Sequence, residues 1–375
     1  MKTRVCLFAF SLGLMAAVLF GCGKSADTLS TILPPPPPRQ QFAYVVNQSS
    51  ENITGYSINA NSGQLTPVAG SPFAANAGNY LGITADPQGK FLFVTDNVIQ
   101  AVEVYSIDSS TGSLTQIAGS PFPAGEEPQF AAVAPSGNFL YVTNAQSNNI
   151  SVYGINRSTG SLTQIPGSPF ATGRYPASIV VSASGNFAYV PNYLDSTIST
   201  YAINASTGAP TLVGTPLAVA TNPACVTLHP SGKYLYVGTI GQETISSFSI
   251  DAVSGALTAG PVLDQPFGTG IFSIAITPAG QFAYTADEAN NSVSEFTVDT
   301  STGNFAAMSG SPLTGIAYPY QVVVDTAGKY LYVVDPTLNG VTAFQINGTT
   351  GGLTPLSGSP FAAGTHPLGM AIATP

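Results

Sequence analysis

The chain has 375 residues, of which 44% are hydrophobic and 7% are charged, and its formal net charge at pH 7 is −9. An average soluble domain has about 25% charged residues, so Ser, Thr, Asn and Gln must cover most of this surface. The nine basic residues form no cluster. This excludes nucleic acid as a partner, because binding to phosphates needs groups of Lys and Arg.

Residues 1–22 have the pattern of a bacterial lipoprotein signal peptide. Lys2 and Arg4 precede an apolar run over residues 5–19, and Leu19-Phe20-Gly21-Cys22 resembles a lipobox, with Phe20 where a smaller residue is usual. The resemblance implies cleavage before Cys22 and lipidation of its thiol. It places the protein in the cell envelope, periplasmic or at the surface, with a lipid as its only contact with the membrane. An ordinary secretory signal is the alternative.

Residues 23–41 are predicted to form a linker, in which Pro34 to Pro38 favour a stiff polyproline II spacer. The rest, residues 42–375, is predicted to be one domain. After cleavage only Cys22 and Cys225 remain, so no disulfide is expected. Cys225 lies in an apolar run and is expected to be buried.

A glycine preceded by Ser or Thr returns about every 48 residues from Gly63 to Gly351. Such a period is typical of a repeat architecture. In one unit, short β-type runs cover residues 131–134, 139–143, 150–155 and 161–165, and turn residues separate them. No window after residue 42 has helical periodicity. The sequence therefore predicts an all-β fold, a seven-bladed β-propeller with four antiparallel strands per blade.

The two ends of the repeat predict how the ring closes. The pattern starts at a second strand, residues 42–46, and stops after a first strand, residues 368–373. We expect the C-terminal strand to join the N-terminal blade, which would remove an exposed sheet edge. We expect the ring to be a monomer.

Propellers bind ligands on one face around the central channel, and five blades have a proline just before the innermost strand. The expected ligand-binding residues near these prolines are Glu126, Gln129, Tyr175, Tyr318, Tyr320 and Gln321. Catalytic candidates at the same place are Arg174, His366 and Glu127. The alternative is that these charged side chains are ordinary solvated residues of surface loops without a catalytic role. His229 follows a strand on the opposite face and is expected to be a surface turn residue.

Each second strand ends in a short polar residue, and three of these are Asp96, Asp287 and Asp335. Such side chains start turns by bonding backbone amides, which accounts for all seven blades. A divalent cation among the three carboxylates is the weaker alternative, since no compact calcium loop is present. No cofactor motif is found, and none is expected.

Three segments carry a family resemblance: residues 135–142, Ile150-Ser-Val-Tyr153 and Ser158-Thr-Gly-Ser-Leu162. Over residues 42–374 the chain resembles the lactonase-type seven-bladed propellers, which include 6-phosphogluconolactonase-like proteins. The resemblance implies opening of a sugar lactone, with Arg and acidic residues around the channel. Family members often have His after the channel proline. Here those places hold Gln129, Ala177, Ala224, Tyr320 and Leu368.

Three functions stay open. As a hydrolase, the protein would activate water through a carboxylate or His and stabilise the oxyanion through Arg174. As a binding module, it would hold a small molecule, peptide, glycan or partner protein without chemistry. As a structural surface protein, it would be a spacer or adhesion element in an assembly. Clustering of Arg174, His366 and Glu127 would favour the first function, and an apolar mouth lined by tyrosines would favour the second.

Overall fold

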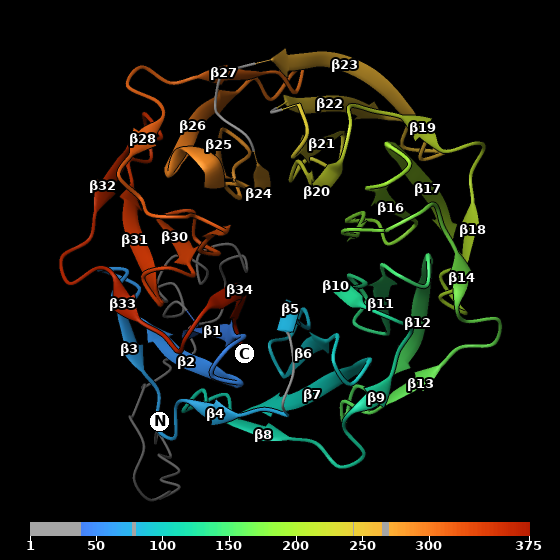
Figure 1. Cartoon of the computed structure of the whole chain (residues 1–375), viewed down its shortest axis with the longest axis horizontal. Coiled ribbons are helices and arrows are strands. Elements are labelled where there is room, and N and C mark those ends of the chain that lie inside the picture. Colours follow the sequence, from blue (N-terminus) through green and yellow to red (C-terminus); the bar gives the residue numbers. More distant parts are fainter. Residues whose placement is uncertain (1–38, 77–79, 243, 265–269) are drawn as a thin grey trace, which may run out of the picture. The chain divides into compact units, whose positions relative to one another are not determined.

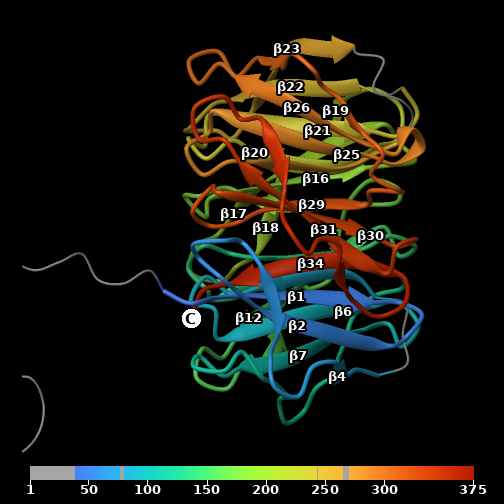
Figure 2. The same cartoon turned by 90° about the vertical axis from the view of Figure 1, so that its left-hand side faces the viewer.

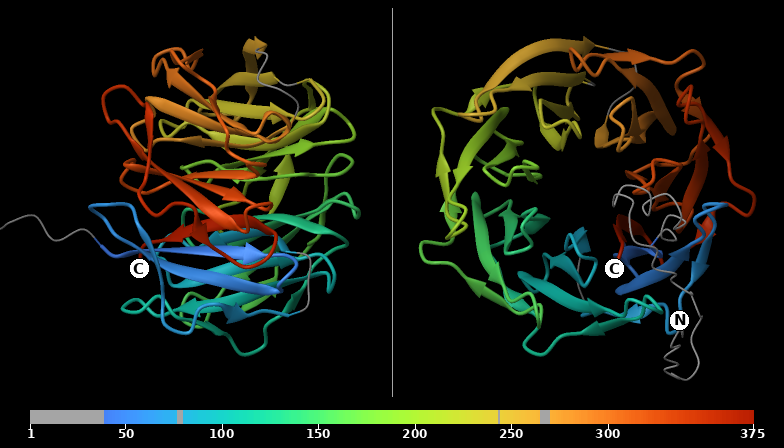
Figure 3. Two further views of the ribbon diagram at one scale, coloured as in Figure 1. Left: turned by 60° about the vertical axis from the view of Figure 1, so that its left-hand side comes forward. Right: turned by 180° about the vertical axis from the view of Figure 1, so that it is seen from behind.

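Seven antiparallel sheets stand around a common axis in the computed structural model (Figure 1). The structure describes residues 39–76, 80–242, 244–264 and 270–375, and residues 39–375 form one unit. The predicted signal peptide, Cys22 and residues 23–38 of the predicted linker lie outside the described residues. The predicted seven-bladed β-propeller is confirmed, and Figure 3 shows the same ring from behind.

Each blade runs from an innermost strand outward. The innermost strands are β34 (Pro367–Ala373), β5 (Tyr80–Ala85), β10 (Pro128–Val133), β15 (Val180–Val181), β20 (Pro223–Leu228), β24 (Ile271–Ile276) and β29 (Gln321–Val324). The second strands are β1 (Gln41–Asn47), β6 (Phe91–Asp96), β11 (Phe139–Asn144), β16 (Phe187–Asn192), β21 (Tyr234–Thr239), β25 (Phe282–Asp287) and β30 (Tyr330–Asp335). The third strands are β2 (Asn52–Ile58), β7 (Ala101–Ile107), β12 (Asn149–Ile155), β17 (Thr197–Ile203), β22 (Thr244–Ile250), β26 (Ser292–Val298) and β31 (Gly340–Ile346).

The outer position of six blades is shared by two short strands that both pair with the third strand. These are β3 (Leu65–Pro67) with β4 (Phe73–Ala74), β8 (Leu114–Gln116) with β9 (Phe122–Pro123), β13 (Leu162–Gln164) with β14 (Phe170–Ala171), β18 (Pro210–Leu212) with β19 (Leu217–Ala218), β27 (Phe305–Ala307) with β28 (Leu313–Thr314), and β32 (Leu353–Pro355) with β33 (Phe361–Ala362). Ser168 lies in one gap between two such strands, where its Oγ accepts a hydrogen bond from Val152 N at 2.9 Å. Blade five instead has one continuous outer strand, β23 (Leu257–Asp264).

The C-terminal strand closes the ring, as the sequence predicts. β34 pairs antiparallel with β1 from Phe42↔Ala373 to Val46↔Gly369, with an irregularity before Asn47. Figure 2 shows the two strands side by side. The first blade is therefore built from both ends of the described chain, and β1 has a neighbour along its inner edge.

The buried apolar side chains form clusters between neighbouring blades rather than within single blades. Tyr44 of β1 packs in one cluster with Leu92 and Val94 of β6, and Tyr284 of β25 packs in another with Leu331 of β30. Because each sheet has both faces covered, the second strands read as nearly continuous apolar runs. The free thiol of Cys225 is buried, as expected, and burial raises its pKa to about 12.

The periodic glycines make a contact that the sequence does not reveal. All seven have positive φ, between 69° and 78°, and a Cβ on any of them would lie 2.3–2.5 Å from a ring carbon of the preceding blade. In six blades a buried tyrosine hydroxyl also donates to the carbonyl of the next blade's glycine: Tyr44 to Gly112, Tyr141 to Gly208, Tyr189 to Gly255, Tyr236 to Gly303, Tyr284 to Gly351 and Tyr332 to Gly63. Phe93 stands at the seventh place. The repeat therefore encodes the joint between blades as well as a turn.

His229 corrects one expectation from the sequence, because it is buried and not a surface turn residue. Its Nδ1 lies 2.7 Å from Ser231 Oγ, and its Nε2 lies 2.9 Å from the carbonyl oxygen of Gly280 in the next blade. The imidazole thus joins two blades. The equivalent Asp86 accepts hydrogen bonds from the turn amides of Lys90 and Phe91.

Candidate functional site

A cavity of about 580 Å³ opens at the mouth of the central channel. We call it the channel-mouth cavity. Its walls come from the loops that lead into the innermost strands, from the first residues of those strands, and from hairpins between second and third strands. It is lined by Ile83, Asn97, Glu127, Gln129, Phe130, Tyr175, Ala177, Tyr193, Leu194, Ala224, Ile240, Phe272, Ser273, Tyr320, Gln321 and Leu368. The volume lies within the range of pockets that hold small molecules.

Five residues predicted from the sequence line this cavity: Glu127, Gln129, Tyr175, Tyr320 and Gln321. Four others, Arg174, His366, Glu126 and Tyr318, do not belong to its lining. The structure therefore brings together most of the expected ligand-binding residues, whereas only Glu127 of the three catalytic candidates reaches the cavity.

The backbone places Glu127 and Tyr175 by the same device. Each precedes a proline and has positive φ, 55° for Glu127 and 57° for Tyr175, a conformation that is uncommon for such residues. The backbone N–H of Tyr175 donates to Asn148 Oδ1 at 2.8 Å, and its carbonyl oxygen accepts from Tyr193 N at 2.9 Å. The hairpin that carries Asn148 thus holds the Tyr175 loop in place.

Glu127 is the centre of a small polar network. Its Oε1 accepts hydrogen bonds from the Tyr175 hydroxyl at 2.8 Å and from Gln129 Nε2 at 2.9 Å. Burial and the hydrogen bond to Glu127 raise the pKa of Tyr175 to about 12. The phenol therefore stays protonated near neutral pH and keeps Glu127 as an acceptor.

Aromatic rings from several blades also line the cavity. The Phe272 and Tyr320 rings stack with centroids 5.1 Å apart, and the Tyr175 and Tyr193 rings lie 5.7 Å apart. Burial, with a smaller contribution from Glu288, raises the pKa of Tyr320 to about 12. Tyr320 is therefore also a neutral donor near pH 7.

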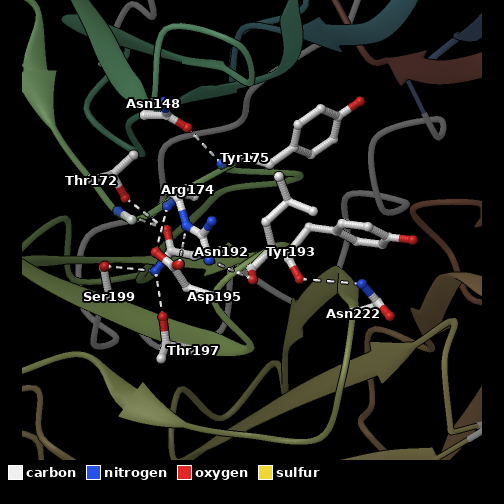
Figure 4. Close-up of polar contacts among 12 residues, drawn as sticks. Asn148, Thr172, Arg174, Tyr175, Asn192, Tyr193, Asp195, Thr197, Ser199 and Asn222 are labelled. Atoms are coloured by element: carbon white, nitrogen blue, oxygen red, sulfur yellow. Dashed lines mark hydrogen bonds and ion pairs between the residues drawn. The ribbon is translucent and has the colours of Figure 1, made fainter.

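Arg174 is engaged elsewhere. Its Nε lies 2.6 Å from Asp195 Oδ1, its backbone N–H donates to Asp195 Oδ2 at 2.7 Å, and 66% of its side chain is exposed. Hydrogen bonds from the Arg174 backbone and then its side chain lower the pKa of Asp195. Figure 4 shows this ion pair on one side of the loop and the Tyr175 and Tyr193 rings pointing to the other.

His366 and Glu126 also lie in loops outside the cavity lining. His366 N donates to Asn339 Oδ1 at 2.8 Å, and its carbonyl oxygen accepts from Gln48 N at 2.9 Å. Glu126 is exposed, and its backbone N–H donates to Ser147 Oγ. Neither side chain forms part of a cluster with Glu127.

The three metal candidates end strands in three different blades. Each is buried, and each accepts hydrogen bonds within its own blade: Asp96 from Val98 N, Asp287 from Thr285 Oγ1, and Asp335 from Thr337 N. Burial raises the pKa of Asp287 to about 6. Within the part of the chain that the structure describes, no group of three or more His, Cys, Asp or Glu side chains could hold a metal ion.

Sequence reasoning missed the aromatic side chains that complete the cavity, Phe130, Tyr193 and Phe272. Phe272 stands two residues before Ile274, as Gln129 stands two residues before Ala131, so alignment of the innermost strands would have found it. Tyr193 gives no such signal, because it starts a hairpin between second and third strands.

Comparison with known proteins places this architecture in a family. A family model described as lactonase, 7-bladed beta-propeller, matches residues 82–262 and 267–366, more than half of the chain. The chain belongs to this lactonase propeller family. No curated protein matches it.

Solved structures share the fold of this lactonase propeller at low sequence identity. One is a candidate 6-phosphogluconolactonase from Bacteroides fragilis, with TM-score 0.78 and 18% identity over 91% of this chain and 99% of that one. Another is a periplasmic gluconolactonase from Pseudomonas aeruginosa, with TM-score 0.75 and 16% identity over 90% of this chain and 99% of that one. At such identity the likeness shows the fold alone.

Proposed function

We propose that this lactonase-family propeller binds a small neutral or cationic molecule in its channel-mouth cavity and does not process 6-phosphogluconolactone. The observation that carries the proposal is the lining itself. It combines five aromatic rings with one carboxylate, Glu127, and has no Lys, Arg or His among its described residues.

A phosphorylated lactone would need a cation to receive its phosphate, because phosphate sites use Arg, Lys or a helix N-terminus. Residues 77–79, 243 and 265–269, which the structure does not describe, contain no basic residue either. Arg174, which precedes the lining residue Tyr175 in the chain, is paired with Asp195. The lining therefore opposes a phosphate and accommodates an uncharged ring.

Titration of a neutral sugar and a neutral sugar lactone into the protein tests the binding proposal. We expect saturable binding that Phe272→Ala weakens about tenfold, since the loss of one aromatic contact costs roughly 1–1.5 kcal/mol. Leu212→Ala, an exposed substitution on the outer strand β18, is the control and should bind as the wild type does. Binding that ignores Phe272→Ala would place the ligand elsewhere.

Hydrolysis of a neutral lactone is a second candidate, and the placement of Glu127 supports it. A carboxylate held by Tyr175 and Gln129 on the wall of a cavity could take a proton from water as the water oxygen adds to the lactone carbonyl. It could return that proton to the ring oxygen as the ring C–O bond breaks, which gives the open hydroxy acid. Proton release from the neutral lactone would then be lost in Glu127→Gln and kept in Glu126→Gln, which alters the exposed neighbour. Equal rates in both variants would exclude Glu127 as the base.

We also propose that Cys22 carries a lipid that anchors the propeller in the cell envelope. The support is the lipobox-like segment of the sequence and the presence of a periplasmic protein among the structures of like fold. Among the residues that the structure describes, no helix is long and apolar enough to cross a membrane. Cys22→Ser should move the protein from the detergent-soluble membrane fraction to the aqueous fraction, and unchanged fractionation would contradict the anchor.

A further inference from the structure

We propose that the channel-mouth cavity selects an organic cation with a methylated ammonium group. The inference rests on the proposed binding function and adds the class of ligand. It follows from three features of the described residues: the aromatic lining, an unpaired carboxylate, and an acidic surround.

The aromatic lining supplies faces that attract a cation. Phe130, Tyr175, Tyr193, Phe272 and Tyr320 all border the cavity. A cation within about 6 Å of an aromatic ring is attracted by the negative face of the ring, and the attraction grows when water is excluded. The rings come from different blades and meet in pairs, Tyr175 with Tyr193 at 5.7 Å and Phe272 with Tyr320 at 5.1 Å between centroids, around the same cavity.

The carboxylate of Glu127 has no cationic partner. Both hydrogen bonds that it accepts come from neutral groups, the Tyr175 phenol and the Gln129 amide. Within the described residues the ion pair between Arg174 and Asp195 is the only one closer than 4.0 Å. A negative charge that borders a cavity without a protein counter-charge is suited to a ligand that brings one.

The loops around the mouth add further negative charge. Glu288 lies near enough to Tyr320 to raise the pKa of its phenol, and Glu126 and Glu51 belong to loops on the same face. Asp195 neutralises Arg174 there, and Lys90, Lys233 and Lys329 lie in turns on the opposite face. A cleft with one sign of charge concentrates ligands of the other sign.

The shortage of acceptors favours a methylated ammonium over a primary amine. A primary ammonium has three N–H donors that each need an acceptor. Glu127 Oε1 already accepts two hydrogen bonds and Gln321 Oε1 accepts one from Met370 N, so Oε2 of the Glu127 carboxylate would have to serve several of these donors. A quaternary ammonium has no N–H and places methyl groups against the rings, so it leaves no donor unsatisfied.

The test compares choline with dimethylbutanol, its uncharged isostere in which carbon replaces the nitrogen, by calorimetric titration of the protein at low salt. We expect choline to bind about tenfold more tightly than the isostere, the size of a partly desolvated cation–π and carboxylate contribution. Glu127→Gln should remove most of this preference and leave the affinity for the isostere unchanged. Glu126→Gln should keep the preference.

Equal affinity for the two compounds, or a choline preference that survives Glu127→Gln, would overturn the inference. Failure of both compounds to bind would overturn it as well. None of these results decides the proposed binding function, which the titrations with neutral sugar and lactone test by themselves.

Discussion

The inter-blade hydrogen bond from a tyrosine to the periodic glycine shows how one residue type holds the ring together. This hydrogen bond is present at six joints. At the joint between the second and third blades, opposite Gly160, the residue is Phe93, which has no hydroxyl to donate. Phe93 is fully buried and occupies the strand position of Tyr141. The Gly160 carbonyl therefore lacks the partner that its six counterparts have among the tyrosine hydroxyls.

Phe93→Tyr should supply that hydrogen bond and raise the free energy of unfolding by about 1 kcal/mol, the typical net value of a buried hydrogen bond. Tyr189→Phe is the matched control and should lower it by a similar amount, because it removes the bond to Gly255. Denaturant unfolding measures both. A destabilising Phe93→Tyr beside a destabilising Tyr189→Phe would show that this joint has no room for the hydroxyl.

A second residue-scale feature is a pair of buried carboxyls in the second blade. Asp96 and Glu103 are fully buried and lie close enough together for each to affect the pKa of the other. The other blades have at most one acid at these two positions, as with Asp287 and Ser294, and some have none, as with Asn144 and Ser151. Burial raises the pKa of Asp96 above its ordinary value of 3.8 and that of Glu103 above 4.5. The negative charge of Glu51 raises the pKa of Asp96 further, and the Tyr105 hydroxyl donates a hydrogen bond to Glu103.

An acid whose pKa is raised on folding makes the folded state take up protons, so stability falls as pH rises above the ordinary carboxyl values. Asp96→Asn removes one such acid and provides the amide found at Asn144. It should stabilise the protein by about 1 kcal/mol near pH 8 and by much less near pH 4.

Thermal unfolding across this pH range measures the effect. Asp335→Asn is the control, because Asp335 ends the same strand of another blade, where Thr342 replaces the glutamate. A stability difference between Asp96→Asn and the wild type that does not change with pH would contradict the raised pKa of Asp96.

At the scale of elements, the sequence predicts the second strands best. The second strand of the third blade begins at Phe139, where the pattern places it, and that of the first blade begins one residue before the predicted start, at Gln41. Their long apolar runs explain this success. The two-residue strands such as Phe170–Ala171 could not be predicted, because two residues cannot show alternation. The innermost strand of the third blade was placed too late, since it starts at Pro128.

The loop that presents Tyr175 depends on the hairpin of the preceding blade through Asn148. Asn148→Gly keeps the positive φ of 54° and removes the hydrogen-bond acceptor, so the loop should loosen. We expect ligand affinity to fall about fivefold, for roughly 1 kcal/mol of lost positioning.

Asn339→Gly is the matched control for this prediction. Asn339 holds His366 N in the same way, but His366 does not line the cavity. Titration of whichever of the neutral sugar, the sugar lactone or choline binds the wild type into both variants should show a loss of affinity for Asn148→Gly alone. Equal losses would mean that the ring as a whole, and not the Tyr175 loop, sets the affinity.

At the scale of the whole molecule, closure by β34 should decide whether the ring is stable. Removal of residues 367–375 would uncover the full inner edge of β1, which pairs with β34 over most of its length. We expect the shortened chain to aggregate, because an exposed apolar edge strand pairs with other chains. Size-exclusion chromatography measures this. Removal of residues 374–375 alone leaves β34 intact and should preserve the native elution, and a monomeric shortened chain would contradict the role of β34.

Only those site residues that occupy repeated positions in the blades could be predicted from the sequence. Gln129, Tyr175 and Tyr320 were found because they occupy repeated places beside the channel prolines. The ion pair of Arg174 could not be predicted from the sequence, because its partner Asp195 lies in another loop. The other blades have no acidic residue at the position of Asp195. Side chains that depend on the closed ring, such as Tyr193 and Phe272, appear together only in the fold.

Proton release from 6-phosphogluconolactone by the wild-type protein, beside Arg174→Ala and Glu127→Gln, tests the central claim most directly. Because the described lining of the cavity has one carboxylate and no Lys, Arg or His, we expect a rate equal to spontaneous hydrolysis for all three proteins. Hydrolysis above that rate that disappears in Arg174→Ala would contradict the claim, and it would place a phosphate-binding lactonase site on this face of the propeller.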